Sequence, residues 1–158
     1  MGTNQSFHIK AGLTVLKPAS EVFEAIVDPA KMSNYFISKS TGRMEEGKKL
    51  EWSFPEMDMS FPIRVGKIEK DKFISYYWND IDGTETFVEM KLEPTKTGTH
   101  VSITEKGHTN DEVGIAWFGR NTEGWANFLA CLKAWLEYGI NLRKGAFEPS
   151  QMPTPSNN

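Results

Sequence analysis

The chain contains little that could support metal or redox chemistry. Cys131 is its only cysteine, so neither an intrachain disulfide nor a thiolate metal cluster can form. The three histidines, His8, His100 and His108, are dispersed, and strand alternation directs His8 and His100 away from the apolar face. The sequence therefore predicts no metal site and no Ser-His-Asp arrangement, and we expect no cofactor.

The chain also lacks an excess of basic residues and any long apolar run. Its 18 basic and 21 acidic residues give a net charge of -3 and are spread along the 158 residues, so nucleic acid is not an expected partner. No apolar run approaches the roughly 20 residues that span a bilayer. The opening MGTNQSFHIKAG has no apolar middle region of a signal peptide. We expect a cytoplasmic protein without membrane insertion.

The length is suited to one hydrophobic core. Residues 1–147 are predicted to form a single domain, and residues 148–158 a disordered tail that is rich in proline and polar side chains.

Hydrophobic periodicity divides the domain into strands and helices. Alternation over residues 7–15 predicts a first strand. Pro18 fits the first turn of a short helix, and Asp28 is a good N-cap for a second one with Pro29 at its first position. Six short alternating runs separated by turn residues then predict an antiparallel meander, at residues 37–44, 49–54, 61–69, 73–79, 85–93 and 99–106.

A long amphipathic helix is predicted at the end of the domain. From Asn121 or Thr122 the apolar residues recur at steps of three and four, and the pattern ends near Lys144 and Gly145. Each predicted strand has one apolar side, and this helix is the only element long enough to cover a sheet of about seven strands. The fold class is therefore α+β.

Two segments near the ends of this domain carry a resemblance to a known family. The first, LKPASEVFEAIVDPAKMSNYF, contains a proline, an aliphatic-aromatic pair, Asp-Pro and an aromatic pair, with Tyr35 where a tryptophan is usual. The second, GWANFLACLKAWLEYG, is similar to a closing helix with an initial Gly-Trp and a final Glu and Gly. Together they resemble the SRPBCC superfamily, also called START-like or birch-pollen-allergen-like. Within it they resemble the branch of the activator of heat-shock protein 90 ATPase homologues.

This resemblance implies a helix-grip fold, in which a curved antiparallel sheet wraps around the long C-terminal helix, with two short helices after the first strand. It also implies a cavity between sheet and helix for small hydrophobic molecules such as lipids, sterols or polyketides. We expect the ligand-binding residues to be the large side chains that face this space: Trp52, Phe54, Tyr76, Trp78, Met90, Trp117, Trp125, Phe128 and Leu132. The alternative is that these side chains only fill the core.

Two charged residues on the strands invite a functional interpretation. Glu105 shares its side of the strand with Val101 and Ile103, so a carboxylate in the cavity could act as a general acid or base. We favour the alternative, a charge at a strand end that reaches water or an ion pair, and give the same interpretation to Arg64. No catalytic residue is assigned.

Three functions remain open at this point. The first is the binding of a small hydrophobic ligand without chemistry, which we expect rather than an enzyme. The second is an enzyme of the polyketide cyclase or dehydratase type. The third is a stress-related, co-chaperone-like protein that stimulates a chaperone ATPase, although 158 residues leave no room for the additional N-terminal domain of the eukaryotic activators. Large residues on both sides of strand 73–79 also leave a homodimer open.

Overall fold

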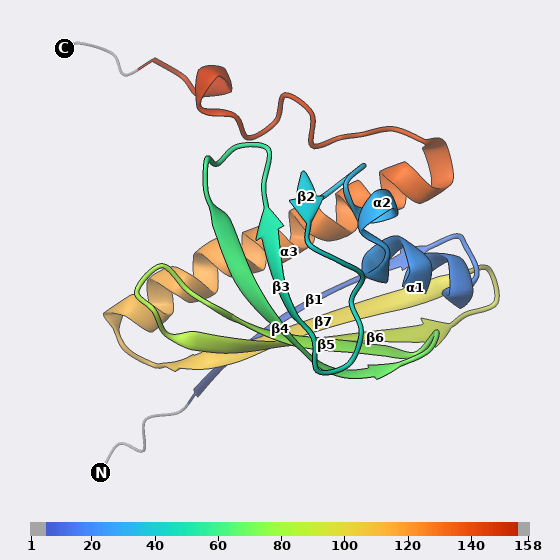
Figure 1. Ribbon diagram of the computed structural model, residues 1–158, viewed down its shortest axis with the longest axis horizontal. Coiled ribbons are helices and arrows are strands. Elements are labelled where there is room, and N and C mark those ends of the chain that lie inside the picture. Colours follow the sequence, from blue (N-terminus) through green and yellow to red (C-terminus); the bar gives the residue numbers. More distant parts are fainter. Residues whose placement is uncertain (1–5, 155–158) are drawn as a thin grey trace.

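Seven antiparallel strands form one sheet in the computed structural model, which describes residues 6–154 (Figure 1). The sheet order is β1-β7-β6-β5-β4-β3-β2, so the first strand lies beside the last. The strands are β1 Ser6–Val15, β2 Lys39–Ser40, β3 Lys49–Ser53, β4 Ser60–Glu69, β5 Phe73–Asn79, β6 Glu85–Pro94 and β7 Thr99–Thr109.

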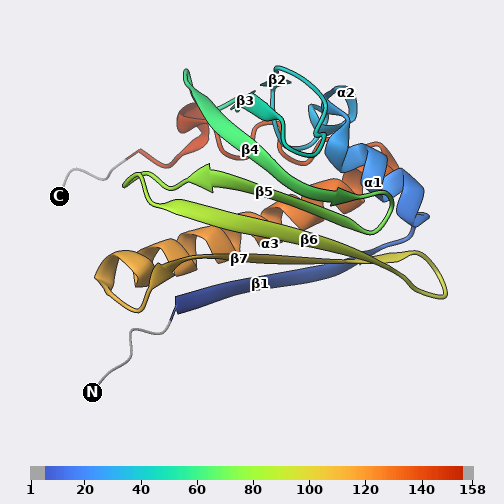
Figure 2. The same ribbon diagram turned by 60° about the horizontal axis from the view of Figure 1, so that its bottom comes forward.

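The helices lie on one side of this sheet. The long helix α3, Glu112–Tyr138, runs along one face, while α1, Ala19–Val27, and α2, Pro29–Met32, lie at one end (Figures 1 and 2). A single 3-10 turn, η1 Pro149–Gln151, follows near the C-terminus. The predicted helix-grip α+β fold is confirmed. Among residues 6–154 we find no helix that combines the length and the apolar character of a membrane span.

Strand alternation places one side of the sheet against α3. Ile103 of β7 pairs with Met90 of β6 and Ala11 of β1, and Met90 and Ile103 are fully buried. The helix contributes Phe128 and Leu132 to the same core, both almost completely buried. The core therefore forms where the apolar sides of the strands meet one face of α3.

The structure corrects both ends of the long helix. It begins at Glu112 rather than at residue 121, because Asp111 acts as the N-cap and accepts a hydrogen bond from the Gly114 amide at 2.7 Å. It ends at Tyr138 rather than near Lys144, because Gly139 adopts a left-handed conformation with φ 65°.

Two predicted strands also differ from the observed ones. The strand predicted at 37–44 is reduced to Lys39–Ser40, since the backbone amide of Met44 donates to the carbonyl of Val27 in α1 instead of to a neighbouring strand. β7 continues past Lys106 to Thr109.

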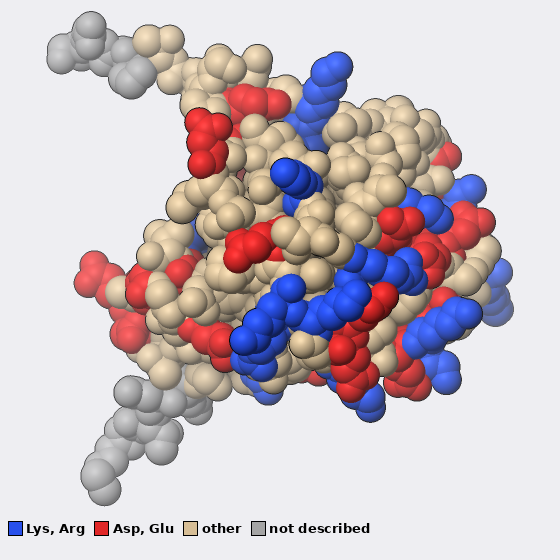
Figure 3. Space-filling model, viewed as in Figure 1, with Lys and Arg blue, Asp and Glu red and all other residues tan. Residues whose placement is uncertain are grey.

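Part of the predicted C-terminal tail is ordered, and charges of both signs mix on the surface. Residues 149–151, which belong to the predicted tail, form η1, whereas residues 1–5 and 155–158 lie outside the described residues. On the face shown in Figure 3, lysine and arginine side chains are interspersed with aspartate and glutamate. No broad field of one sign covers this face.

The corrected helix start gives a first prediction. Gly119 lies in α3, and a methyl group added at this residue would meet no other atom; the same holds for Gly139 at the helix end. Gly119→Ala should raise the free energy of unfolding by about 1 kcal/mol, because alanine is the better helix former. Gly139→Ala should lower it by roughly 1 kcal/mol or more, because alanine resists a positive φ. Urea denaturation of both variants measures these changes, and an unchanged Gly119→Ala would contradict a helix that starts at Glu112.

Candidate functional site

A fully buried carboxylate, that of Glu105, lies between the sheet and α3. Register places Glu105 of β7 beside Val88 of β6 and Ile9 of β1, in the apolar interior. Its oxygen Oε1 accepts hydrogen bonds from Trp125 Nε1 at 2.8 Å and Asn121 Nδ2 at 3.0 Å, both from α3.

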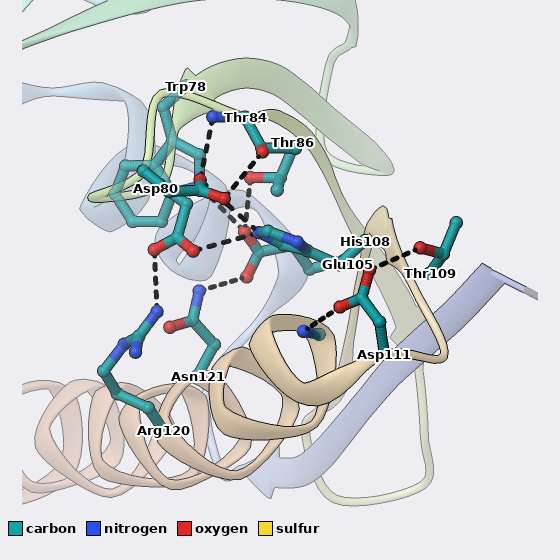
Figure 4. A network of polar contacts seen from close by, with 12 residues as sticks. Trp78, Asp80, Thr84, Thr86, Glu105, His108, Thr109, Asp111, Arg120 and Asn121 are labelled. Atoms are coloured by element: carbon teal, nitrogen blue, oxygen red, sulfur yellow. Dashed lines mark hydrogen bonds and ion pairs between the residues drawn. The ribbon is translucent and has the colours of Figure 1, made fainter.

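The other oxygen of Glu105 is bound by the sheet. Oε2 accepts from Thr86 Oγ1 at 2.6 Å and Trp78 Nε1 at 2.9 Å (Figure 4). A carboxylate offers about four acceptor positions, so these four donors occupy all of them. Glu105 therefore ties β5, β6, β7 and α3 together through neutral donors.

This arrangement corrects the favoured interpretation of Glu105. Its side chain reaches neither water nor a cation, because it is completely buried and its four partners are two indoles, an amide and a hydroxyl. Arg64, in contrast, is exposed as expected, forms an ion pair with Glu85 at 3.2 Å and lies over the ring of Tyr77.

A second polar group, not predicted from the sequence, lies at the same end of the interior. His108 Nε2 is 2.9 Å from Asp80 Oδ2, and Arg120 Nη2 donates to Asp80 Oδ1 at 2.7 Å. Strict alternation would turn His108 outward, but Gly107, with φ 148°, interrupts the pairing of β7 with β1 and turns His108 inward. A glycine inside a strand was the available signal.

The cluster of Asp80, Asp82 and His108 resembles a metal site, but the cation that Asp80 binds is the guanidinium of Arg120. Single ligand atoms of Asp80, Asp82 and His108 lie within 4.8 Å of one another. The guanidinium of Arg120 binds Asp80 directly, so the group is an ion-pair network that joins the β5–β6 turn to α3 (Figure 4).

The large side chains predicted to line the cavity form a ring cluster. Tyr76 packs against Trp52 and Trp78, each with ring centroids 5.2 Å apart, and Trp125 packs against Phe128 at 5.4 Å. Of the nine predicted residues, seven are buried and two, Phe54 and Trp78, are partly buried. Met90 and Leu132 lie in the same core, while Trp117 lies apart from the cluster against His108.

Phe36 is the ring that connects this cluster, and it was not among the predicted site residues. Its ring contacts four of the predicted ones, with centroids at 4.8 to 6.3 Å: Trp52, Phe54, Trp125 and Phe128. The aromatic pair Tyr35-Phe36 was assigned only to the apolar side of a short helix. Its position next to the sheet depends on how α2 folds back, and no local pattern reports that.

A hollow of about 130 Å³ opens beside Phe36. Its walls come from the segment after α2, from Pro55 and from the segment that follows α3. The lining residues besides Pro55 are Ser33, Tyr35, Phe36, Ile37, Asn141, Arg143, Lys144 and Glu148. A second hollow, of about 290 Å³, lies beside Tyr77, Phe87 and Lys106, whose side chains are only partly buried or exposed. Only the first is continuous with the ring cluster, through Phe36.

Two buried polar atoms in this interior have no hydrogen-bond partner among the described residues. They are the hydroxyl of Tyr76 and the indole nitrogen Nε1 of Trp117. Burial raises the pKa of the Tyr76 phenol well above its usual range, and the charge of Glu105 acts in the same direction. The Tyr76 hydroxyl is therefore a neutral donor without an acceptor.

Comparison with known protein families finds one that matches most of the chain. The family model for "Activator of Hsp90 ATPase homolog 1-like protein" matches residues 17–137, from before α1 almost to the end of α3. The chain belongs to this family. A comparison with curated proteins finds no match.

Solved structures share the fold of this member of the Hsp90 ATPase activator-like family. The protein SSP2350 from Staphylococcus saprophyticus is 31% identical, with a TM-score of 0.77 over 87% of this chain and 96% of that one. The Aha1 dimer from Colwellia psychrerythraea is 18% identical, with a TM-score of 0.72 over 85% of this chain and 99% of that one.

A third similar structure is DynU16, a protein in the dynemicin biosynthetic locus. It is 23% identical, with a TM-score of 0.74 over 84% of this chain, which spans 48% of DynU16. At this identity DynU16 shares the fold alone, as does the Colwellia protein.

The role of Glu105 gives a second prediction. In Glu105→Gln the amide nitrogen faces two donors, which lose their acceptor at about 1–3 kcal/mol each. The free energy of unfolding should therefore fall by about 2–6 kcal/mol, measured by urea denaturation. Glu89→Gln, on the neighbouring strand β6 and without a hydrogen bond or ion pair among the described residues, is the control and should change little. Equal losses in the two variants would contradict the network.

Proposed function

We propose that the protein binds a small apolar molecule at the Phe36 end of the ring cluster, in the hollow between the segment after α2 and the segment after α3. The observation that carries this proposal is the hollow of about 130 Å³ walled by Tyr35, Phe36 and Ile37. An apolar cavity of about 150 Å³ is enough to hold one benzene ring. The hollow is slightly smaller than that and has a polar wall, so a ligand of about one ring would fill it.

The ring cluster supports deeper contacts for larger ligands. Phe36 separates the hollow from the predicted contact residues Trp52, Phe54, Trp125 and Phe128. A rotamer change of Phe36 would let a second ring or a short chain reach them, since stacking and edge contacts between rings are worth about 0.5–1.5 kcal/mol each. The remaining predicted residues, Tyr76, Trp78, Met90, Trp117 and Leu132, are proposed contacts only for such larger ligands.

The unpartnered hydroxyl of Tyr76 could donate a hydrogen bond to a larger ligand that reaches the ring cluster. A buried donor without an acceptor costs about 1–3 kcal/mol, and a ligand carbonyl or ether oxygen beside Tyr76 would recover it. The hydroxyl lies in a wall of rings from Trp52 and Trp78. A mostly apolar site with a few placed polar groups is typical for small molecules.

An enzyme of the polyketide cyclase or dehydratase type is the second candidate. Two observations favour it: the polar groups that converge on Glu105, and the likeness to DynU16, which comes from a biosynthetic locus. Glu105, however, uses all four acceptor positions on protein donors, so none remains for a substrate proton. Binding without chemistry is therefore the better-supported function.

The proposal predicts that a neutral one-ring compound binds and that filling the hollow stops it. Isothermal titration with benzamide should show saturable binding to the unchanged protein. Ser33→Phe, which places a ring at the exposed wall residue Ser33, should weaken binding at least about tenfold, or about 1.4 kcal/mol. Ser38→Phe, exposed but outside the hollow, is the matched control and should bind as the unchanged protein does. No binding of benzamide, or equal weakening in both variants, would contradict the proposal.

A further inference from the structure

The segment after α3 covers the hollow beside Phe36. Gly139 ends the helix in a left-handed conformation, and the chain then turns back across the end of the molecule that carries α2 and β2 (Figures 1 and 2). Asn141, Arg143 and Lys144 of this segment form one wall of the hollow. The wall opposite the rings is therefore polar and carries two cations.

Arg143 holds a carboxylate at this wall. Its Nε donates to Glu56 Oε1 at 2.8 Å and its Nη2 to Glu56 Oε2 at 2.9 Å. The two side chains are only 17% and 9% exposed. Parallel bonds from a guanidinium to both oxygens of one carboxylate are the most specific geometry that proteins use to recognise carboxylates.

Aromatic rings surround the same guanidinium. Its carbon lies 5.6 Å from the ring centroids of Phe36 and Phe54 and 5.1 Å from that of Phe147. These contacts hold the guanidinium in place and leave its side chain largely buried. Phe36 also walls the hollow, so the carboxylate-binding group and the space for an apolar body are adjacent.

We propose that Arg143 is the recognition group for the carboxylate of a small apolar acid, and that Glu56 occupies its place. The inference rests on the proposed function and names the ligand class for the same hollow. The acid's ring or short apolar body fills the space beside Tyr35 and Phe36. Its carboxylate takes the two donor positions of Arg143, and Glu56 moves into water.

The exchange is balanced in charge and in hydrogen bonds. One carboxylate leaves Arg143 and another arrives, so the net gain comes from burying the apolar body of the ligand. Glu56 lies between β3 and β4, where its neighbour Met57 is exposed. Displacement of Glu56 therefore requires a movement of this connection alone.

The other charged residues at this wall, Lys144 and Glu148, cannot attract a ligand carboxylate without Arg143. Glu148 lines the hollow, accepts from the Gly145 amide through Oε1 and has no partner among the described residues at Oε2. Backbone hydrogen bonds, followed by the charge of Arg143, lower the pKa of Glu148, so it stays negative. Without Arg143 the wall would hold only Lys144 against Glu148, and a second carboxylate would find no net attraction.

The test compares benzoate with benzamide, which has the same ring without the charge. Isothermal titration of the unchanged protein should give saturable binding of both. Arg143→Gln should weaken benzoate at least about tenfold, as expected for loss of a charge-assisted bidentate contact, and should weaken benzamide by a clearly smaller factor. Glu56→Gln should tighten benzoate several-fold, because the competing carboxylate is removed.

A second arginine-carboxylate pair supplies the matched control. Arg43 donates to both oxygens of Glu24, at 2.8 and 2.7 Å, outside the hollow. Arg43→Gln and Glu24→Gln should leave benzoate binding unchanged. Arg143→Lys keeps the charge without the bidentate geometry and should fall between Arg143→Gln and the unchanged protein. Should Arg143→Gln fail to fold, Glu56→Gln and Arg143→Lys still decide the question.

The outcomes separate this inference from the proposed function. If benzamide binds but benzoate is insensitive to all Arg143 and Glu56 variants, Arg143 is not the recognition group and the hollow still binds apolar molecules. If neither compound binds any variant, both the ligand class and the proposed function are wrong. Tightening of benzoate by Glu56→Gln together with weakening by Arg143→Gln is the result that we expect.

Discussion

The buried carboxylate of Glu105 is the constraint on which the interior depends. A charge without hydrogen bonds at this depth would cost several kcal/mol, so its four donors must hold their places. Two of them come from α3 and two from the neighbouring strands β5 and β6. The position of α3 over the sheet is thereby set at this point, and so is the orientation of the indoles of Trp78 and Trp125.

The aromatic rings pack one against the next from Glu105 towards Phe36. Trp78 and Trp125 stack at 5.8 Å, and Tyr76, Trp52 and Phe128 pack around them. At the Glu105 end the interior is closed by the Asp80 network and by α3. Space remains at the opposite limit of the cluster, where Phe36 meets the segment after α3. The hollow and the ion pair between Arg143 and Glu56 therefore lie at the end of the cluster away from Glu105, where we propose that a small ligand binds.

The sequence predicts those parts of the fold that depend on neighbouring residues, and it misses those that depend on contacts between distant segments. Alternation found six of the seven strands but overextended the one predicted at 37–44, and Asp28-Pro29 found the second short helix, because these patterns are local. The start of α3 was missed because its first turns, EVGIAWFGR, contain two glycines and show little amphipathic spacing. The inward turn of His108 was missed because a single bulge at Gly107 reverses parity.

The polar contacts of the site could not be predicted from the sequence, because their partners lie far apart in the chain. Parity placed Glu105 inward, but its four donors lie 16 to 27 residues away on three elements. Arg143 and Glu56 are 87 residues apart, and both look like ordinary surface charges in their local context. Such pairs depend on how the segment after α3 folds back, which no periodicity encodes.

We infer that the hollow beside Phe36 receives the ligand. The most direct measurement is a crystal structure with 4-bromobenzoate, in which anomalous scattering locates the bromine. We predict a bromine peak between Tyr35 and Phe36 with the carboxylate on Arg143 and Glu56 displaced. A peak beside Tyr77 and Phe87 on the outer face, or no peak in the interior at saturating compound, would contradict the claim.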